Sequence, residues 1–121
     1  MPSESTSLGR IEISPNAIAT IASQAAMQSY GVVGMAPKNV VDGLTNTLRL
    51  TRDPRHGAEV LVNGDEITIN LYIIVEYGTR ISAVASSIVN LVRFNVEKML
   101  GLKVGEVNVH VQGLRVSNTD A

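Results

Sequence analysis

Two segments of the chain carry apolar residues at the spacing of an amphipathic helix. The first helix is expected to follow Ser14, a residue that suits a helix N-cap, and to stop near Gly31. It begins with Pro15, because the N–H that proline lacks needs no partner in the first turn of a helix. The second opens after Gly78-Thr79 and ends at Gly101, since glycine is common just past a helix C-terminus. The positions expected to face the core are Ile18, Ile21, Ala22 and Ala25 in the first helix and Ile81, Val84, Ala85, Ile88, Val92, Val96 and Met99 in the second.

Alternating apolar and polar residues predict the strands. Residues Leu8–Ile13 predict a short, half-buried strand. Asn63-Gly64-Asp65, between Glu59–Val62 and Glu66–Tyr77, predicts a tight hairpin because Asn-Gly favours such turns. In the last strand a change of parity at Gly113 predicts a β-bulge. The inward positions are expected to be Ile11 and Ile13 in the first strand, Ile67, Ile69, Leu71, Ile73 and Val75 in the hairpin, and Val107, Val109, Val111, Leu114 and Val116 in the last strand.

The segment between Val32 and Gly57 fits two interpretations. Val40, Val41, Leu44 and Leu48 have helical spacing, whereas Leu48 and Leu50 alternate with polar residues as in a strand. Asp53–Gly57 is expected to be a loop, because Pro54 disfavours helix at the preceding residue and glycine permits a positive φ.

The order of elements is strand, helix, short element, two antiparallel strands, helix and strand. This order predicts an α/β (α+β) two-layer sandwich in which both main helices cover one face of a small mixed sheet. We expect one domain over residues 9–116, flanked by short polar tails at 1–8 and 117–121.

Composition narrows the class of function. The net charge is −1 and the pI is near 6.1, so the chain lacks the general electrostatic attraction to nucleic acid that a basic domain has. Aromatic residues make up 3%, so few side chains are available to stack on bases. The absence of cysteine excludes thiol catalysis and Cys-zinc sites. No apolar run approaches the roughly 18 residues of a membrane span, and no secretion signal opens the sequence. A cytoplasmic location is therefore expected.

Candidate chemistry is sparse. The two histidines, His56 and His110, are expected in a loop and on the polar face of the last strand, and neither has an obvious partner for catalysis or metal binding. Asp65-Glu66 suits a hairpin tip better than acid–base chemistry. We therefore expect no catalytic, metal-binding or cofactor-binding residues and no enzymatic activity.

Five residues are candidates for interaction. A basic cluster is formed by Arg49, Arg52, Arg55 and His56. It could bind an acidic partner, a phosphate or anionic headgroups. Asp53 and Glu59 partly neutralise the cluster, and a solvated loop is the simpler interpretation. Arg80 stands at a helix start, where backbone N–H groups favour anions, although any capped helix offers as much.

Two other features bear on partners. Gly31-Val32-Val33-Gly34 has the G-x-x-G spacing that a KH domain uses to clamp a nucleic-acid backbone, but its interior is apolar, which favours packing. The outer face of the long helix carries small polar residues and few charges, a composition that is easy to bury in an interface. These residues are Ser82, Ser86, Ser87, Asn90 and Asn95.

Several ordered motifs together resemble the alkaline shock protein family, also called the Gls family of envelope stress response proteins of Gram-positive bacteria. The motifs are Gly9–Ser14, Tyr30–Met35, Ile73–Ile81, Val96–Leu102 and Val107–Gly113. The resemblance implies a non-enzymatic cytoplasmic protein of cell-envelope homeostasis and stress, with self-assembly and, in some members, a membrane-anchored protein partner. The short tails resemble a short housekeeping branch of the family and put in doubt any anchoring that depends on charged extensions.

The leading hypothesis is accordingly a small scaffold or interaction module of the cell envelope that associates with itself. Its interfaces are expected on the polar face of the long helix, the strand at Leu8–Ile13 and the Arg49–His56 loop. A KH-like nucleic-acid-binding module is the alternative, and a small-ligand or enzymatic role around Thr79, Arg80 and His110 is the third hypothesis.

Overall fold

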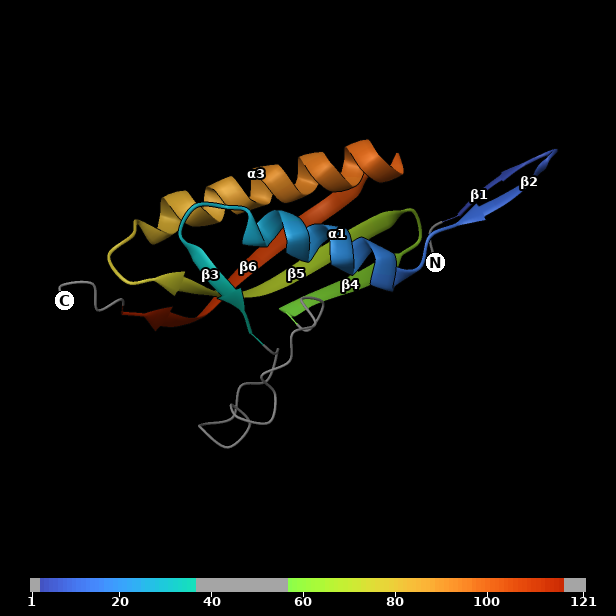
Figure 1. Ribbon diagram of the computed structural model, residues 1–121. Helices are drawn as coiled ribbons and strands as arrows, with labels where there is room; N and C mark the ends of the chain where they lie inside the picture. The colour runs from blue at the N-terminus through green and yellow to red at the C-terminus, as the bar shows by residue number, and fades with distance from the viewer. Residues whose placement is uncertain (1–2, 37–56, 117–121) are drawn as a thin grey trace, which may run out of the picture.

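A computed structural model of the 121-residue chain describes residues 3–36 and 57–116. Two α-helices lie over one face of a β-sheet, and a separate two-stranded hairpin projects from the body near the N-terminus (Figure 1). The elements in chain order are β1 (Ser3–Thr6), β2 (Gly9–Glu12), α1 (Pro15–Met27), β3 (Val32–Met35), β4 (Ala58–Asn63), β5 (Glu66–Glu76), α3 (Ile81–Leu100) and β6 (Val104–Arg115). The predicted two-layer sandwich is confirmed.

Strand β5 is the centre of the main sheet. Along one side, β3 pairs with its C-terminal half and β4 with its N-terminal half, both antiparallel. Along the other side, β6 pairs with β5 in parallel over nearly the whole length of both strands. The sheet is therefore mixed, and β6 forms one of its edges.

The local signals at the helix ends act as the sequence indicates. Ser14 Oγ accepts a hydrogen bond from Ala17 N at 3.2 Å, and Pro15 opens α1. Gly101 ends α3 in the left-handed conformation at φ 70°, and its N–H donates to Glu97 O. Helix α1 ends slightly early, at Met27 with Gln28 as its C-cap, ahead of the glycine expected to stop it.

The hairpin of β4 and β5 is also confirmed. Asn63 pairs with Glu66, and Gly64 lies between them at φ 65°, a conformation that glycine adopts without a steric cost. This register turns alternate residues of β5 toward the helices. The buried residues of that face are Ile67, Ile69, Leu71, Ile73 and Val75.

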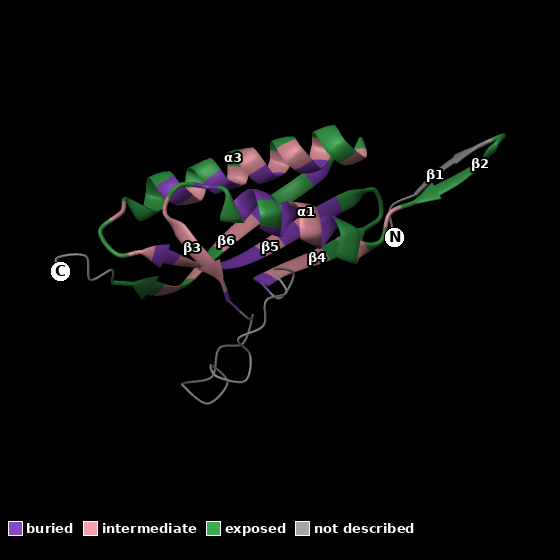
Figure 2. Cartoon of the chain, viewed as in Figure 1, coloured by how far each residue is buried: buried purple, intermediate pink, exposed green. Residues whose placement is uncertain are grey.

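The core lies between the sheet and the two helices (Figure 2). Helix α1 contributes Ile18 and a flank of alanines, which lets it lie close to the sheet. Helix α3 contributes a stripe of buried residues, Val84, Ile88, Val92 and Val96. Met99, expected on that stripe, is 66% exposed, because the buried residues follow one another at four-residue spacing and Leu100 is the residue of the last turn that packs against the core.

The prediction for the first strand was wrong in part. Strand β2 pairs with β1, which arises from residues placed in the polar tail, and not with the main sheet. Ile11 is consequently 59% exposed, whereas Ile13, just beyond the hairpin, packs against the core. Alternation indicates a strand but does not identify the strand with which it pairs.

The G-x-x-G segment forms a strand and not the clamping loop of the KH-like interpretation. Val32–Met35 is β3, which pairs with β5 around a register shift between Val32 and Gly34. Gly31 lies just before it at φ 90°, close to α3. The two interpretations of the following segment, and residues 53–56 of the loop expected at Asp53–Gly57, fall outside the described residues. Gly57 directly precedes β4 and does not have a positive φ.

Candidate interaction surface

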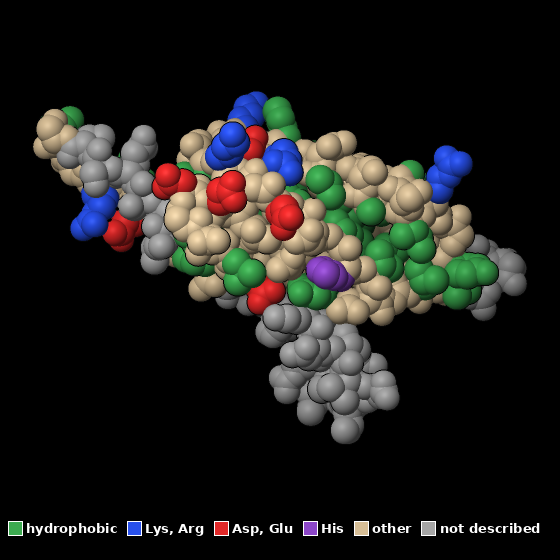
Figure 3. Space-filling model, turned by 180° about the vertical axis from the view of Figure 1, so that it is seen from behind, with side chains coloured by type: hydrophobic (Ala, Val, Ile, Leu, Met, Phe, Trp, Pro, Cys, Tyr) green, Lys and Arg blue, Asp and Glu red, His purple; other side chains and the backbone are tan. Residues whose placement is uncertain are grey.

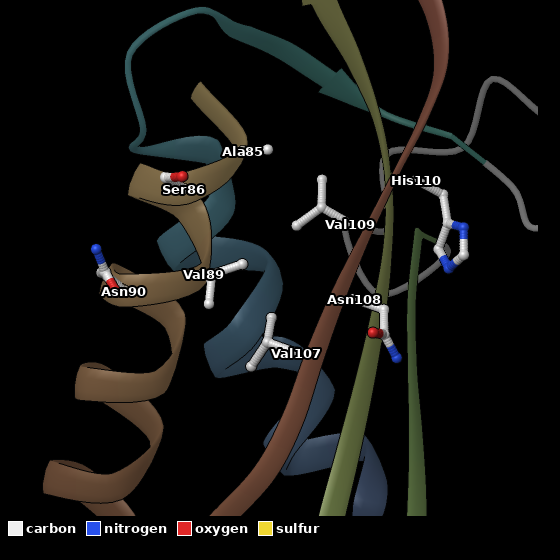
Figure 4. Close-up of a pocket in the computed structure, with 8 residues that line it drawn as sticks. All are labelled: Ala85, Ser86, Val89, Asn90, Val107, Asn108, Val109 and His110. Atoms are coloured by element: carbon white, nitrogen blue, oxygen red, sulfur yellow. The ribbon is translucent and has the colours of Figure 1, made fainter. Parts of the chain in front are cut away.

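A groove runs between α3 and the edge strand β6 (Figure 4). Its volume is about 540 Å³, and it is open to the outside along one side. Four of its side chains, Ala85, Val89, Val107 and Val109, point into the space between helix and strand. Ser86 and Asn90 line its outer rim on the helix, while Asn108 and His110 lie on the other face of β6. The floor of the groove is therefore aliphatic.

The helix pattern explains why Ala85 and Val89 are only half-buried. Val84 and Ile88 point at the sheet and fill the core, so their neighbours Ala85 and Val89 fall on the flank of α3 that faces the sheet edge. From Ile81 to Val92 the helix carries no charged residue. A flank of this composition costs little to remove from water.

A polar tie fixes α3 against β6 at one end of the groove. Arg93 Nη1 donates to Val104 O at 2.6 Å, and Glu97 Oε2 accepts from Val104 N at 3.0 Å. Both backbone groups of Val104 are thus satisfied by side chains of the helix. The tie holds the helix against the start of β6, so the groove is set by the fold.

The outer edge of β6 has no neighbouring strand among the described residues, since β5 is its one partner there. Register shifts relative to β5 occur near both ends, between Val104 and Glu106 and between Val111 and Gly113. The second shift confirms the bulge expected near Gly113. Between the two shifts the strand alternates regularly, with Val107, Val109 and Val111 on the helix side.

The other face of the sheet carries a row of polar side chains that contact one another. Asn108 Nδ2 donates to Asn70 Oδ1 at 2.9 Å, and Asn70 Nδ2 donates to Glu59 Oε1 at 3.2 Å. The rings of Tyr72 and His110 stack at a centroid distance of 4.6 Å. Asn108 and His110 of β6 are therefore held by side chains of β5. On this side of the molecule, charged side chains lie mainly toward one end, and hydrophobic side chains extend from the histidine toward the other end (Figure 3).

Arg80, one of the five residues predicted for interaction, does not line the groove. Arg49, Arg52, Arg55 and His56 are outside the described residues. Arg80 is exposed at the N-cap of α3 and makes no side-chain capping bond, while Thr79 Oγ1 donates to Glu76 O. Of the polar helix residues singled out from the sequence, Ser86 and Asn90 do line the groove. The valines of β6 were expected in the core, and nothing local in the sequence marks that strand as an edge.

In residues 3–36 and 57–116, no group of three or more His, Asp or Glu side chains is arranged to hold a metal ion. The same part of the chain contains no helix that is both long and apolar enough to span a bilayer.

The fold and the sequence together define the class of protein. Residues 3–116 match the family of alkaline shock protein 23, which is described as having a cell envelope-related function. The chain therefore belongs to the alkaline shock protein family, as the motifs indicated, and the family's function is related to the cell envelope.

Relatives in two Gram-positive bacteria agree with this assignment. The chain is 47% identical over 114 residues to the uncharacterized protein YloU of Bacillus subtilis (strain 168), covering 93% of this chain and 94% of YloU. It is 37% identical over 110 residues to the uncharacterized protein Spy1614 of Streptococcus pyogenes serotype M6, covering 89% of each.

A solved structure shares the fold. A variant of the MamM CTD in its zinc form superimposes with a TM-score of 0.50, at 16% sequence identity, over 86% of this chain and 90% of that domain. At this identity the likeness shows the fold alone.

Proposed function

We propose that this protein is a small, non-enzymatic scaffold of the cell envelope, which acts by associating with itself and with a membrane-anchored protein partner on the cytoplasmic side. The observation that carries the proposal is the open edge of β6 beside an aliphatic groove. The cell-envelope function of the family supplies the setting.

An open strand edge is a strong basis for association. Its outward backbone N–H and C=O groups offer a row of hydrogen bonds to an added strand, and pockets beside the edge add specificity. Proteins that avoid such association place prolines or charges on their edges. Strand β6 contains no proline, and its charged residues, Glu106 and Arg115, lie near its two ends. The centre of the edge is therefore suited to pairing.

Self-association is tested by size-exclusion chromatography with light scattering across a concentration series. We expect the weight-average mass to rise above 12.9 kDa as concentration increases. A mass that stays at one chain at millimolar concentration contradicts the scaffold proposal and leaves a monomeric adaptor.

The membrane-anchored partner is tested by flotation with two kinds of vesicle. We expect the protein to float with native vesicles from a Gram-positive bacterium, and not with protein-free vesicles of the same lipids or with protease-stripped native vesicles. Flotation with protein-free vesicles would contradict a protein partner.

The basic residues Arg49, Arg52, Arg55, His56 and Arg80 are the proposed contacts to acidic groups of that partner. Arg80 is the best variant because its exposed position lets it change without disturbing the core. We expect Arg80→Glu to weaken flotation with native vesicles and to leave self-association unchanged. Equal flotation of wild type and variant removes Arg80 from the contact.

A further inference from the structure

The regular stretch of β6 has the same alternation of apolar and polar positions in both directions. Val107-Asn108-Val109-His110-Val111 alternates valine with a polar residue, and Val109 is its midpoint. The three valines lie on the helix side of the sheet, while Asn108 and His110 lie on the polar side. A strand with this symmetry can pair with a copy of itself running in the opposite direction without placing an apolar side chain opposite a polar one.

The faces of the sheet restrict the possible registers. In an antiparallel pair, directly opposite residues point to the same face of the sheet. The two-fold axis must therefore pass midway between one residue and its own copy, and we call this an axis through that residue. An axis through Asn108 pairs Val107 with Val109 but places Val111 opposite Gly105, which lies inside the first register shift. An axis through Val109 pairs all three valines, Val107 with Val111 and Val109 with its own copy, and places Asn108 opposite His110.

The helix beside the edge fits the same arrangement. A two-fold axis perpendicular to the sheet keeps the helices of both copies on one face, so the two α3 helices lie beside each other over the joined edge. The part of α3 that lines the groove, around Ala85 and Val89, belongs to the uncharged first half of the helix. Valines of the second copy would enter the open side of the groove, beside Val107 and Val109.

We infer that two copies of this chain join β6 to β6 in antiparallel fashion about a two-fold axis through Val109, which makes one continuous sheet with both helical layers on the same face. The occupant of the groove is a second copy of the chain. This inference rests on the self-association proposed above and specifies its surface and register.

Single cysteines test the register directly, because the chain has no cysteine of its own. Opposite Cα atoms in an antiparallel pair are about 4.5–5.5 Å apart, within the about 4.4–6.8 Å of a disulfide. In the inferred register the two Cα atoms of residue 109 meet this condition, while those of residue 108 are offset along the strands and about 8 Å apart. We expect Val109→Cys to form a covalent dimer under mild copper-phenanthroline oxidation and Asn108→Cys to remain largely monomeric.

Opposite charges at the axis provide a second test that does not depend on cysteine chemistry. Val109→Asp and Val109→Lys each place a charge against its own copy, so each variant alone should dimerise more than about tenfold more weakly than wild type. An equimolar mixture should recover a heterodimer, because Asp then lies opposite Lys. This recovery requires both variants to be folded, which separates lost association from lost structure.

The outcomes distinguish the inference from the broader proposal. If wild type is monomeric at all concentrations, self-association fails and the inference fails with it. If wild type associates but Asn108→Cys crosslinks in place of Val109→Cys, or the charged variants associate like wild type, the scaffold proposal stands and this interface is overturned. Crosslinking at Val109 together with heterodimer recovery supports the inference.

Discussion

The close approach of Gly31 to α3 predicts a large and specific cost for a single methyl group. Gly31 lies at φ 90°, and a Cβ added there would stand 2.9 Å from Val84 Cγ2 and 3.5 Å from Thr79 Cγ2. Val84 is 4% exposed and buried in the core, so its methyl group has no free space into which to move. The positive φ costs a non-glycine residue about 1–2 kcal/mol, and overpacking adds about 1–3 kcal/mol.

We therefore expect Gly31→Ala to lower the free energy of unfolding by about 2–5 kcal/mol, which corresponds to a fall in Tm of about 8–20 °C for a chain of this length. Urea and thermal denaturation followed by circular dichroism measure this change. Protein concentration is held constant, because association with a second copy also contributes to stability.

Gly34 is the matched control within the same G-x-x-G segment. It has no positive φ, and a Cβ there would meet nothing within 4 Å. Gly34→Ala should leave stability unchanged or raise it by up to about 1 kcal/mol, since alanine restricts the unfolded chain. Equal effects of the two substitutions, within about 0.5 kcal/mol, would refute the structural role assigned to Gly31.

Three further substitutions test the packing around the groove and the helices. Glu97→Ala removes the acceptor of Val104 N and should lower the free energy of unfolding by about 1–3 kcal/mol in urea denaturation. The control Glu106→Ala, at an exposed position, should change it by less than about 0.5 kcal/mol. Similar values for the two variants would argue against the polar tie between α3 and β6. Ser14→Ala removes the N-cap of α1 and should cost about 0.5–2 kcal/mol by the same assay, and no loss would mean that another group caps the helix. Ile88→Ala opens a cavity in the core and should lower the free energy of unfolding by about 2–5 kcal/mol, so a thermal midpoint within a degree of wild type would contradict its burial.

The sequence predicts the helices and strands of this fold better than it predicts which strands pair with each other. The helical stripe from Val84 to Val96 and the hairpin at Asn63-Gly64 depend on local periodicity and turn chemistry, and both are confirmed. Ile11 shows the limit, because its alternation with polar residues is real but its strand pairs with β1 outside the main sheet. Strand pairing is set by contacts between distant segments, which a local pattern does not contain.

For the candidate surface too, the sequence shows the composition of each face but not which strand lies at the edge of the sheet. The low charge of the outer face of α3 is visible in the sequence, and Ser86 and Asn90 do lie beside the groove. Val107 and Val109 were correctly placed on the apolar face of the last strand, yet alternation identifies a face and not an edge. The position of β6 outside β5 becomes visible once the parallel pairing of the two strands is known.

Hydrogen–deuterium exchange at low and high protein concentration tests the central claim most directly, namely that copies of the chain meet at the open edge of β6. Amide groups on an unpaired edge exchange quickly and become protected when a second strand pairs with them. We predict concentration-dependent protection in peptides from Val104–Arg115 and the first half of Ile81–Leu100, with no change in Ala58–Asn63. Protection that appears in β4 or in the β1–β2 hairpin while β6 stays unchanged would contradict the account.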